Sequence, residues 1–349
     1  MCIFAAAKQQ NLSMNISLSD IKEQLKTPQR IVIVTHTNPD GDAIGSALGL
    51  YHFLYTLRIH QVAVITPTPY PVYLQFMAAN EKVNIYTHNT LRCQKLVAEA
   101  TMLFVLDCNT ASRLDDLGKH VDAADCTKIL IDHHLAPDLA TNFRVWDTSA
   151  SSTAELVCDF IDMIRPQTSL SEAAVLCLYT GIATDTGRFK HATNAKTLQT
   201  VARLLDDGLD ITTANNLIFD NNTESRLRLL GFILSQRMVV LPEYKAAYIY
   251  VSTADLVTFN YQTGDLEGVV NYPLSIDGIN VVALFKEQTN EVRISMRSKG
   301  HFSVNDVARK HFEGGGHRNA AGGVSKQSLD ETIVYFKKVL DQYQTELVY

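Results

Sequence analysis

The sequence has no pair of cysteines in C-x-x-C spacing, and its six cysteines are scattered over 349 residues. In a chain of this length, that pattern indicates reduced thiols and excludes a disulfide framework. No apolar run reaches the roughly 18 residues that a membrane helix needs. The first ten residues, MCIFAAAKQQ, lack the basic start and the long apolar stretch of a secretory signal. These absences predict a cytoplasmic protein without a membrane segment.

Positive charge is also scarce, because 31 Lys and Arg stand against 37 Asp and Glu, for a net charge of −6. Proteins that hold long nucleic acid by its phosphates normally carry a basic surface, so a long duplex is disfavoured as a partner. Charged residues make up 19% and hydrophobic residues 46%, which excludes intrinsic disorder. The length exceeds the size at which a single core usually stops growing, so two domains are expected.

The first part of the chain alternates strand-like and helix-like segments. Short β-branched runs predict strands at 31–35, 62–65, 103–106 and 129–131, and apolar periodicity predicts helices at 43–57, 152–164, 171–181 and 194–205. This alternation predicts an α/β domain with a doubly wound, mostly parallel sheet covered on both faces. Ligands of such sheets bind at the carboxyl ends of the strands. We place this domain at residues 14–222.

The pattern then changes, and we expect one connecting helix over 223–239, followed by a smaller α+β domain over 240–349. Strand-like runs occur at 246–251, 281–285 and 292–296, and helical patterns at 304–311 and 329–347. The second and third of these strands flank Gln-Thr-Asn, which favours a hairpin turn.

Acidic and histidine side chains follow the predicted strands of the first domain. The first strand is followed by His36, Asp40 and Asp42, the third by Asp107, the fourth by Asp132, His133 and His134, and a later helix by Asp185. Pro39 and Gly41 force an irregular turn, so His36, Asp40 and Asp42 can converge. A turn or capping role explains any one of these carboxylates, but four clusters at one sheet edge favour a shared site.

Carboxylates gathered at one edge would repel one another unless cations lay between them. Carboxylate and imidazole together are the ligands of Mn²⁺, Fe²⁺, Co²⁺ or Zn²⁺, and Asp107 could bridge two ions. A two-metal site suits displacement at phosphorus. The sequence therefore predicts two divalent ions and a phosphoryl substrate.

The second domain carries a glycine-rich stretch, FEGGGHRNAAGG, within a basic window. We interpret the run after Gly314–Gly316 as a short helix, whose N-terminal backbone N–H groups would bind an anion, with His317 adding a hydrogen bond. A turn that permits tight packing is the alternative. Residues 286–326 hold eight Lys and Arg against four acids, a net charge of +4. Arg297 and Ser298 end a predicted strand, as a phosphate-binding fork would.

Five motifs in order, HTNPDGDAIGS, VLDCN, IDHH, GIATDTGRF and FEGGGHRNAAGG, resemble those of the DHH phosphoesterase family with its DHH-associated C-terminal domain. Within that family the chain is similar to the nanoRNase group. The resemblance extends from Ile31 to the final helix. It implies two domains with the active site in the cleft between them, and two Mn²⁺ ions, with Mg²⁺, Co²⁺ or Fe²⁺ as alternatives.

The resemblance also implies roles for residues at matching positions. One ion would be held by His36, Asp40 and Asp107, and the other by Asp42, Asp107, His133 and Asp185. His134 would face the scissile phosphate beside the bridging Asp107, and Asp132 would orient the neighbouring histidines. The implied substrate-binding residues are Arg297, Ser298, Gly314, Gly315, Gly316 and His317.

The implied reaction is hydrolysis of short RNA, two to about five nucleotides long, to nucleoside 5′-monophosphates, together with conversion of pAp to AMP. So short a substrate needs few phosphate contacts and is compatible with the negative net charge. Alternatives left open are a phosphodiesterase for pApA or cyclic dinucleotides, a pyrophosphatase, a single-strand DNA exonuclease and a non-catalytic RNA-binding module. A homodimer is also left open, because no residues point to it.

Overall fold

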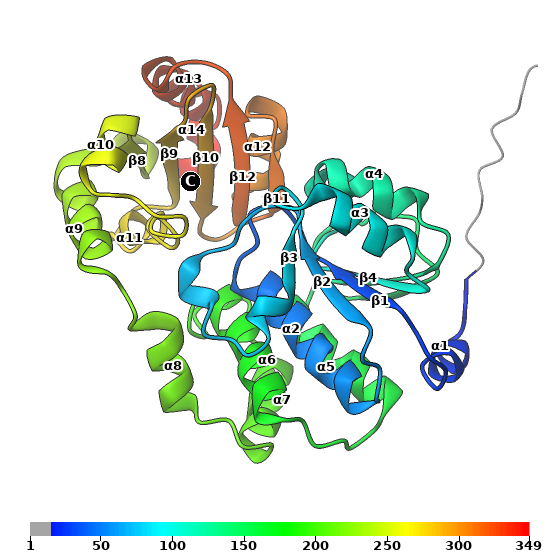
Figure 1. Cartoon of the computed structure of the whole chain (residues 1–349). Helices are drawn as coiled ribbons and strands as arrows, with labels where there is room; N and C mark the ends of the chain where they lie inside the picture. The colour runs from blue at the N-terminus through cyan, green and yellow to red at the C-terminus, as the bar shows by residue number, and fades with distance from the viewer. Residues whose placement is uncertain (1–14, 349) are drawn as a thin grey trace, which may run out of the picture. The chain divides into compact units, whose positions relative to one another are not determined.

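The structure, a computed structural model, describes residues 15–348 and divides into two units. The first comprises the chain up to Tyr70 with Leu74–Ile218, and the second comprises Pro71–Tyr73 with the chain from Phe219 onward (Figure 1). The domain limits given above stay predictions. The N-terminal segment, in which we expected no signal sequence, lies outside the described residues, as does the expected domain start at residue 14.

The first unit is built on a six-stranded sheet whose neighbouring strands are all parallel. Its order is β3-β2-β1-β4-β5-β6. The strands are β1 (Ile31–Val34), β2 (Val62–Thr66), β3 (Val83–Ile85), β4 (Met102–Leu106), β5 (Thr127–Asp132) and β6 (Phe143–Trp146). The central strands are apolar throughout because helices cover both faces of the sheet. The doubly wound α/β fold expected from the sequence is confirmed.

Strand order reverses between β1 and β4, which pair with Val34 opposite Val105. The chain leaves these two strands in opposite lateral directions, so the segments after their carboxyl ends start side by side and then diverge. This is the position at which doubly wound sheets bind their ligands. The residues after Val34 and after Leu106 therefore begin at the same edge of the sheet.

Eight helices are described in the first unit. They are α1 (Leu18–Gln24), α2 (Gly41–Thr56), α3 (Thr90–Ala98), α4 (Asp116–Ala123), α5 (Thr153–Ile164), α6 (Glu172–Asp185), α7 (Ala195–Asp206) and α8 (Ile211–Phe219). One face of the sheet is covered by α3 and α4, whose Val97 and Leu117 join the core with Val32 and Val105. The other face is covered by α2 and α5, and α6 packs against both of these helices (Figure 1).

Helices α2 and α6 approach each other closely because glycines line their interface. A Cβ atom on Gly45 would lie 2.4 Å from the carbonyl oxygen of Cys177, and one on Gly41 would lie 2.3 Å from Oγ1 of Thr184. The first turn of α2 therefore packs beside the last turn of α6. This contact brings Asp42, in that first turn, close to the C-terminal end of α6 at Asp185.

The second unit contains a mixed six-stranded sheet in the order β11-β12-β10-β9-β8-β7. Its strands are β7 (Met238–Leu241), β8 (Ala246–Val251), β9 (Val281–Glu287), β10 (Val292–Ser298), β11 (Gly315–His317) and β12 (Ala320–Ser325). Only β8 and β9 pair in parallel; the other described neighbours are antiparallel. The predicted hairpin is present between β9 and β10, where Gln288 N–H donates to the carbonyl of Glu291 at 2.8 Å.

Helices cover both faces of this second sheet. They are α9 (Glu224–Phe232), α10 (Thr253–Thr258), α11 (Asn271–Leu274), α12 (Val304–His311), α13 (Leu329–Gln342) and α14 (Gln344–Val348). Successive residues of β8 enter different cores, Tyr248 with Phe336 of α13 and Ile249 with Leu229 of α9. This confirms the expected smaller α+β unit. Among the helices described in both units, none has the length and apolar character needed to cross a membrane.

The helix expected over 223–239 was wrong at its C-terminal end. Helix α9 ends at Phe232, a single π-helical turn follows over Ile233–Arg237, and Met238 already belongs to β7. The apolar run from Met238 to Leu241 is as compatible with a strand as with a helix. Pairing with β8 decides the outcome, since Met238 lies opposite Ile249.

Candidate active site

His36 lies two residues beyond β1 and is buried. Its Nδ1 lies 2.7 Å from the carbonyl oxygen of Thr37, so Nδ1 carries a proton and, in the neutral ring, Nε2 presents a lone pair. Nε2 is buried with no hydrogen-bond partner among the described residues, although it lies 3.2 Å from Oδ2 of Asp107 and 3.9 Å from Oδ2 of Asp40. An electron pair aimed at carboxylates in this way is typical of a metal ligand.

Asp40 and Asp42 start helix α2. Asp40 is its N-cap, and Oδ1 accepts hydrogen bonds from the backbone N–H groups of Asp42 and Ala43 at 3.1 and 3.0 Å. Its other oxygen, Oδ2, is the atom that faces His36. Capping therefore fixes the orientation of the Asp40 carboxylate and leaves one oxygen directed at the cluster.

Asp107 follows β4 and is buried, with a left-handed backbone of φ 56°. Its two oxygens face different histidines. Oδ2 lies 3.2 Å from Nε2 of His36, whereas Oδ1 lies 3.6 Å from Nε2 of His133 and 3.4 Å from Nδ1 of His134. One carboxylate thus has an oxygen on each of two neighbouring ligand groups, which is the geometry of a bridging ligand.

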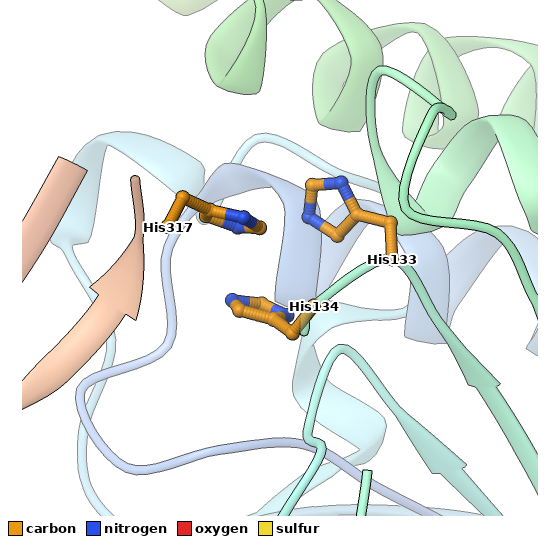
Figure 2. A group of neighbouring side chains, drawn as sticks. All are labelled: His133, His134 and His317. Carbon is orange, nitrogen blue, oxygen red and sulfur yellow. The ribbon is translucent and has the colours of Figure 1, made fainter. Parts of the chain in front are cut away.

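His133 leaves the end of β5 together with His134, and their rings meet edge to face with centroids 4.9 Å apart (Figure 2). Nδ1 of His133 lies 3.3 Å from the carbonyl oxygen of Ala150, to which it donates when Nε2 is unprotonated. Nε2 then faces three carboxylates, with oxygens of Asp185, Asp107 and Asp42 at 3.5, 3.6 and 3.9 Å. Four donor atoms from four separate segments converge on this point.

His134 is held differently, because its Nδ1 lies 2.8 Å from Oδ1 of Asp132. That distance is a hydrogen bond between a ring N–H and a carboxylate, which fixes the tautomer and leaves Nε2 at the opposite edge of the ring. Asp132 is fully buried on β5, and its Oδ2 has no hydrogen-bond partner among the described residues. Asp132 therefore acts on the orientation of His134.

Helix α5 directs its N-terminal N–H groups at the same cluster. The backbone N–H groups of Thr153 and Ala154 donate to Oδ2 and Oδ1 of Asp42 at 2.7 and 2.9 Å, and the Thr153 hydroxyl donates to Oδ1 of Asp107 at 3.0 Å. The Ser46 hydroxyl adds a hydrogen bond to Asp42 at 3.1 Å. The positive end of the α5 dipole thus offsets part of the cost of burying Asp42.

Ser46, Thr153 and Arg113 also contact or influence the cluster, and they were not predicted from the sequence. A signal for Thr153 does exist, because Ser152 followed three residues later by Glu155 resembles the capping pattern that starts a helix. Arg113 accepts a hydrogen bond from Thr37 N–H through its carbonyl at 2.7 Å, and its guanidinium acts to lower the pKa values of His36 and His134. Nothing in its local sequence indicates that position.

The pKa values of His36, Asp42 and His133 are all raised, which shows that the clustered carboxylates lack compensating positive charge. Burial, together with the charges of Asp107 and Asp185, raises the pKa of Asp42 well above its usual value. Burial acts to lower the pKa of His133, but the carboxylates of Asp185, Asp107 and Asp42 raise it to about 9. Burial likewise opposes protonation of His36, whose pKa is nevertheless raised by Asp107 and Asp40. Divalent ions would supply the charge that these protons otherwise provide.

The described residues therefore fit a metal centre. Within the first unit, donor atoms lie within 4.8 Å of one another in the groups His36–Asp40–Asp107, Asp42–Asp107–His133 and Asp107–Asp132–His134. The third group includes the hydrogen bond between Asp132 and His134, which already explains that proximity. The first two share Asp107, and their nitrogen and oxygen donors suit Mn²⁺, Fe²⁺, Co²⁺ or Zn²⁺.

In the second unit, Arg297 and Ser298 occupy the end of β10, as expected. The Ser298 hydroxyl donates to the carbonyl of Phe302 at 2.7 Å and accepts from the Asn319 side chain at 2.8 Å, so its proton is already committed. His317 is half-buried on β11 (Figure 2). The roles assigned to these three residues stay predictions.

The expectation that a helix follows Gly314–Gly316 was wrong. Gly315–His317 form β11, which pairs with β12 in a hairpin. Glycine is needed for this pairing, because a Cβ on Gly314 would lie 2.0 Å from the carbonyl oxygen of Gly322. The N–H groups of Gly314 and Gly316 donate to the Ala308 carbonyl and to Oδ1 of Asn305, at 3.2 and 2.8 Å. Tight packing in a hairpin therefore explains the glycines, and their contact with an anion stays a prediction.

Comparison with known proteins gives two family matches. The model described as "DHH family, N-terminal domain" matches residues 30–182, and the "DHHA1 domain" model matches residues 243–346. The chain is 32% identical to the bifunctional oligoribonuclease and PAP phosphatase NrnA of Thermus thermophilus, over 91% of this chain and 90% of that protein. It is 30% identical to the protein of the same name from Bacillus subtilis, over 86% of this chain and 90% of that protein.

Two solved structures share the fold. The crystal structure of an exopolyphosphatase-related protein from Bacteroides fragilis has a TM-score of 0.90 and 36% identity, and the match covers 95% of this chain and 97% of that one. RecJ from Thermus thermophilus, crystallised with Mn²⁺, has a TM-score of 0.55 and 14% identity, and the match covers 94% of this chain and 55% of that one. The second likeness concerns the fold alone.

Proposed function

The chain belongs to the DHH family of metal-dependent phosphoesterases, and on that premise we propose that it hydrolyses short oligoribonucleotides to nucleoside 5′-monophosphates and converts pAp to AMP. The relatives named for both activities match nearly the whole chain, so the assignment covers both units. Within the structure, the geometry of Asp107 gives the strongest support, because its two oxygens face two separate groups of metal-ligand donors.

We propose that the two groups hold two divalent ions. His36, Asp40 and Asp107 would hold one ion, and Asp42, Asp107, His133 and Asp185 would hold the other. When bound, the two ions supply Lewis acidity at a phosphoryl group and lower the pKa of water. Mn²⁺ is the proposed ion, with Mg²⁺, Co²⁺ and Fe²⁺ as alternatives, because the ligands combine imidazole with carboxylate.

His134 is proposed to contact the scissile phosphate. The hydrogen bond from Nδ1 to Asp132 fixes the ring, and Nε2 is the nitrogen that we propose to hydrogen-bond a phosphoryl or leaving oxygen. Burial lowers the pKa of His134, in contrast to the raised pKa of its neighbour His133. The two adjacent histidines would thus have different roles, His133 as a ligand and His134 as a substrate contact.

For the second unit we propose that Arg297, Ser298, Gly314, Gly315, Gly316 and His317 surround the terminal phosphate or nucleotide of the substrate. The net charge of +4 over residues 286–326 supports an anionic ligand there. Because the N–H groups of Gly314 and Gly316 are already used, Arg297 and His317 would provide most of the attraction. A few such contacts suffice for a substrate of a few nucleotides, whereas a long duplex would need many more.

A substrate panel tests the proposed function. The purified enzyme with Mn²⁺ is assayed on a dinucleotide, a 5-mer and a 24-mer RNA, pAp, pApA, cyclic di-AMP and pyrophosphate. We expect the highest kcat/KM on the dinucleotide and pAp. Dominant turnover of pApA, cyclic di-AMP or pyrophosphate would overturn the assignment, and so would binding of RNA without cleavage. Sedimentation of the same preparation tests the homodimer.

Replacement of the bridging carboxylate tests the metal centre. Asp107→Ala removes a donor from both groups, so we expect metal content to fall and turnover on pAp to drop by at least about 100-fold. Asp116→Ala is the matched control, because Asp116 is an exposed residue at the start of α4 that pairs with Lys119. Unchanged metal content and turnover in Asp107→Ala would contradict the proposed centre.

We also propose that the protein lies in the cytoplasm, on the basis of its thiols. Cys93, Cys108, Cys126, Cys158 and Cys177 are free, and burial raises the pKa of Cys108 to about 12. Free thiols, four of these five buried, are usual in a reducing compartment, which supports a cytoplasmic enzyme.

A further inference from the structure

We propose that Trp146 and Leu135 form a nucleobase subsite beside the phosphate-binding centre, an inference that rests on the proposed function. Stacking on the indole would hold the base of the nucleotide whose phosphate is cleaved. The subsite would accept any of the four bases, because stacking uses the face of the base and not its hydrogen-bonding edge. Trp146 is the only tryptophan in the chain.

The position of Trp146 is fixed by the sheet. It is the last residue of β6 and lies opposite Asp132, the last residue of β5, in the parallel register. Its indole Nε1–H donates to the backbone carbonyl oxygen of His134 at 2.8 Å. The ring is therefore anchored directly to the residue that we propose as the contact of the scissile phosphate.

The indole remains open to a ligand despite this anchor. Trp146 is 47% exposed, and Leu135, the residue after His134, is 40% exposed. Tryptophan usually buries a large area, so a half-exposed indole forgoes much of the free energy that its burial would contribute. Because the hydrogen bond already restrains the ring, little further conformational entropy would be lost when a base stacks on it.

The chemistry of the ligand follows from this neighbourhood. A phosphoryl group at His134 belongs, in the proposed substrates, to a nucleotide with a flat aromatic base a few bonds away. Trp146, hydrogen-bonded to the His134 backbone, and Leu135, the next residue along the chain, are exposed apolar side chains, and neither carries a charge that would repel or pair with that phosphate. Inorganic substrates such as pyrophosphate have no group to use this surface, so the subsite would also favour nucleotides over them.

A single tryptophan makes the contact directly observable. We expect AMP to change the intrinsic emission of the Mn²⁺-loaded enzyme in a saturable way when the indole is excited at the red edge of its absorption, where adenine does not absorb. Ribose 5-phosphate carries the same phosphate without a base and should leave the emission unchanged. Calorimetric binding of AMP without any change in emission would overturn the proposal. An emission change that follows protein concentration without nucleotide would do the same, since it would assign the surface to a second copy of the chain.

Substitutions separate stacking from the hydrogen bond. Trp146→Ala should raise KM for pAp about tenfold with little change in kcat, because a base contact removed equally from ground and transition states affects binding. Trp146→Phe lacks the indole N–H but keeps an aromatic face, so it should recover most of the affinity. Tyr55→Ala is the matched control, because Tyr55 is an aromatic residue, 52% exposed, near the C-terminal end of α2 and far along that helix from Asp42.

Different results would reject the proposed function and the base subsite. Absence of wild-type turnover on dinucleotides and pAp would reject the proposed function, whatever Trp146 does. Normal turnover with an unaltered KM in Trp146→Ala would reject the subsite alone. A loss of kcat in Trp146→Ala that Trp146→Phe shares would show that the indole N–H only orients His134, and this too would overturn the base-binding role.

Discussion

The backbone of Asp107 adopts a conformation that few residues other than glycine tolerate, with φ 56°. The turn places a short carboxylate, buried, between two histidines that come from β1 and β5. The place of Asp107 after an apolar strand predicted it as a metal ligand. It could not show that the two oxygens diverge toward His36 and His133, since this depends on residues about 70 and 26 positions away.

For Ser298, the structure gives less support to the predicted role than it does for Asp107. Its residue type and its place at a strand end suggested a phosphate contact, but the hydroxyl proton is donated to Phe302. The position was predictable from the strand pattern. The direction of the hydrogen bond was not, because it depends on how the loop after β10 folds back.

Asp132→Asn is predicted to lower kcat on pAp by about 100-fold while metal content stays unchanged. The asparagine amide can present N–H to Nδ1 of His134 where the carboxylate accepts, which favours the other ring tautomer. Steady-state kinetics across pH with metal analysis checks this, since an altered pH profile distinguishes positioning from simple loss of fold. Asp138→Asn is the control in the same loop, with an exposed side chain. A loss of metal in Asp132→Asn would instead make Asp132 a ligand.

At the scale of elements, long strands and helices followed from periodicity, whereas short ones did not. β8 and α12 occupy the predicted ranges 246–251 and 304–311. β3 has three residues, none of them fully buried, and so carries almost no pattern. The glycine-rich hairpin was predicted as the start of a helix. Glycine residues indicate that the backbone can adopt unusual conformations, but they do not show which neighbouring segment packs against them.

The π-helical turn before β7 is predicted to depend on Asp255. Nε and Nη2 of Arg237 donate to Oδ2 and Oδ1 of Asp255, each at 2.9 Å, and these hydrogen bonds lower the pKa of Asp255 despite its burial. Asp255→Asn should therefore reduce the free energy of unfolding by about 2 kcal/mol near neutral pH. Urea denaturation of the variant and of Asp277→Asn, an exposed control, measures this difference.

The pH dependence of that difference has a definite sign. The carboxyl of Asp255 has a lower pKa in the folded chain than its unfolded value of 3.8, so its contribution is fully present above that value. It is lost as the pH falls below it, toward the folded pKa. The stability difference between wild type and Asp255→Asn should therefore shrink in acid. A difference that grows as the pH falls would contradict the assignment of the pair.

At the scale of the whole molecule, the chain folds into two units with separate sheets and cores, and only the first contains the proposed metal centre. The length of the chain predicted two domains because one core stops growing at this size. The inclusion of Pro71–Tyr73 in the second unit could not be foreseen, since this segment lies in the first half of the sequence.

Metal removal is predicted to destabilise the first unit selectively. An ion that binds only the folded state stabilises it by about 2.7 kcal/mol at 100 times its dissociation constant. Hydrogen exchange with and without a chelator should show faster exchange around His36–Asp42, Asp107 and the start of α5 when metal is removed. Peptides from β8 and β9 serve as the internal reference. Equal acceleration in both units would contradict a metal centre confined to the first.

The sequence by itself determined the chemistry of this protein: which residues follow which strands, that they combine carboxylate with imidazole, and that glycines and basic residues gather in the second half. These are local facts, encoded in the period of apolar residues and in irregular turns. Tertiary structure decided that β1 and β4 are neighbours, and that the α5 N–H groups of Thr153 and Ala154 reach Asp42 across 111 and 112 positions. Contacts over such separations leave no local pattern, because they depend on how the whole chain packs.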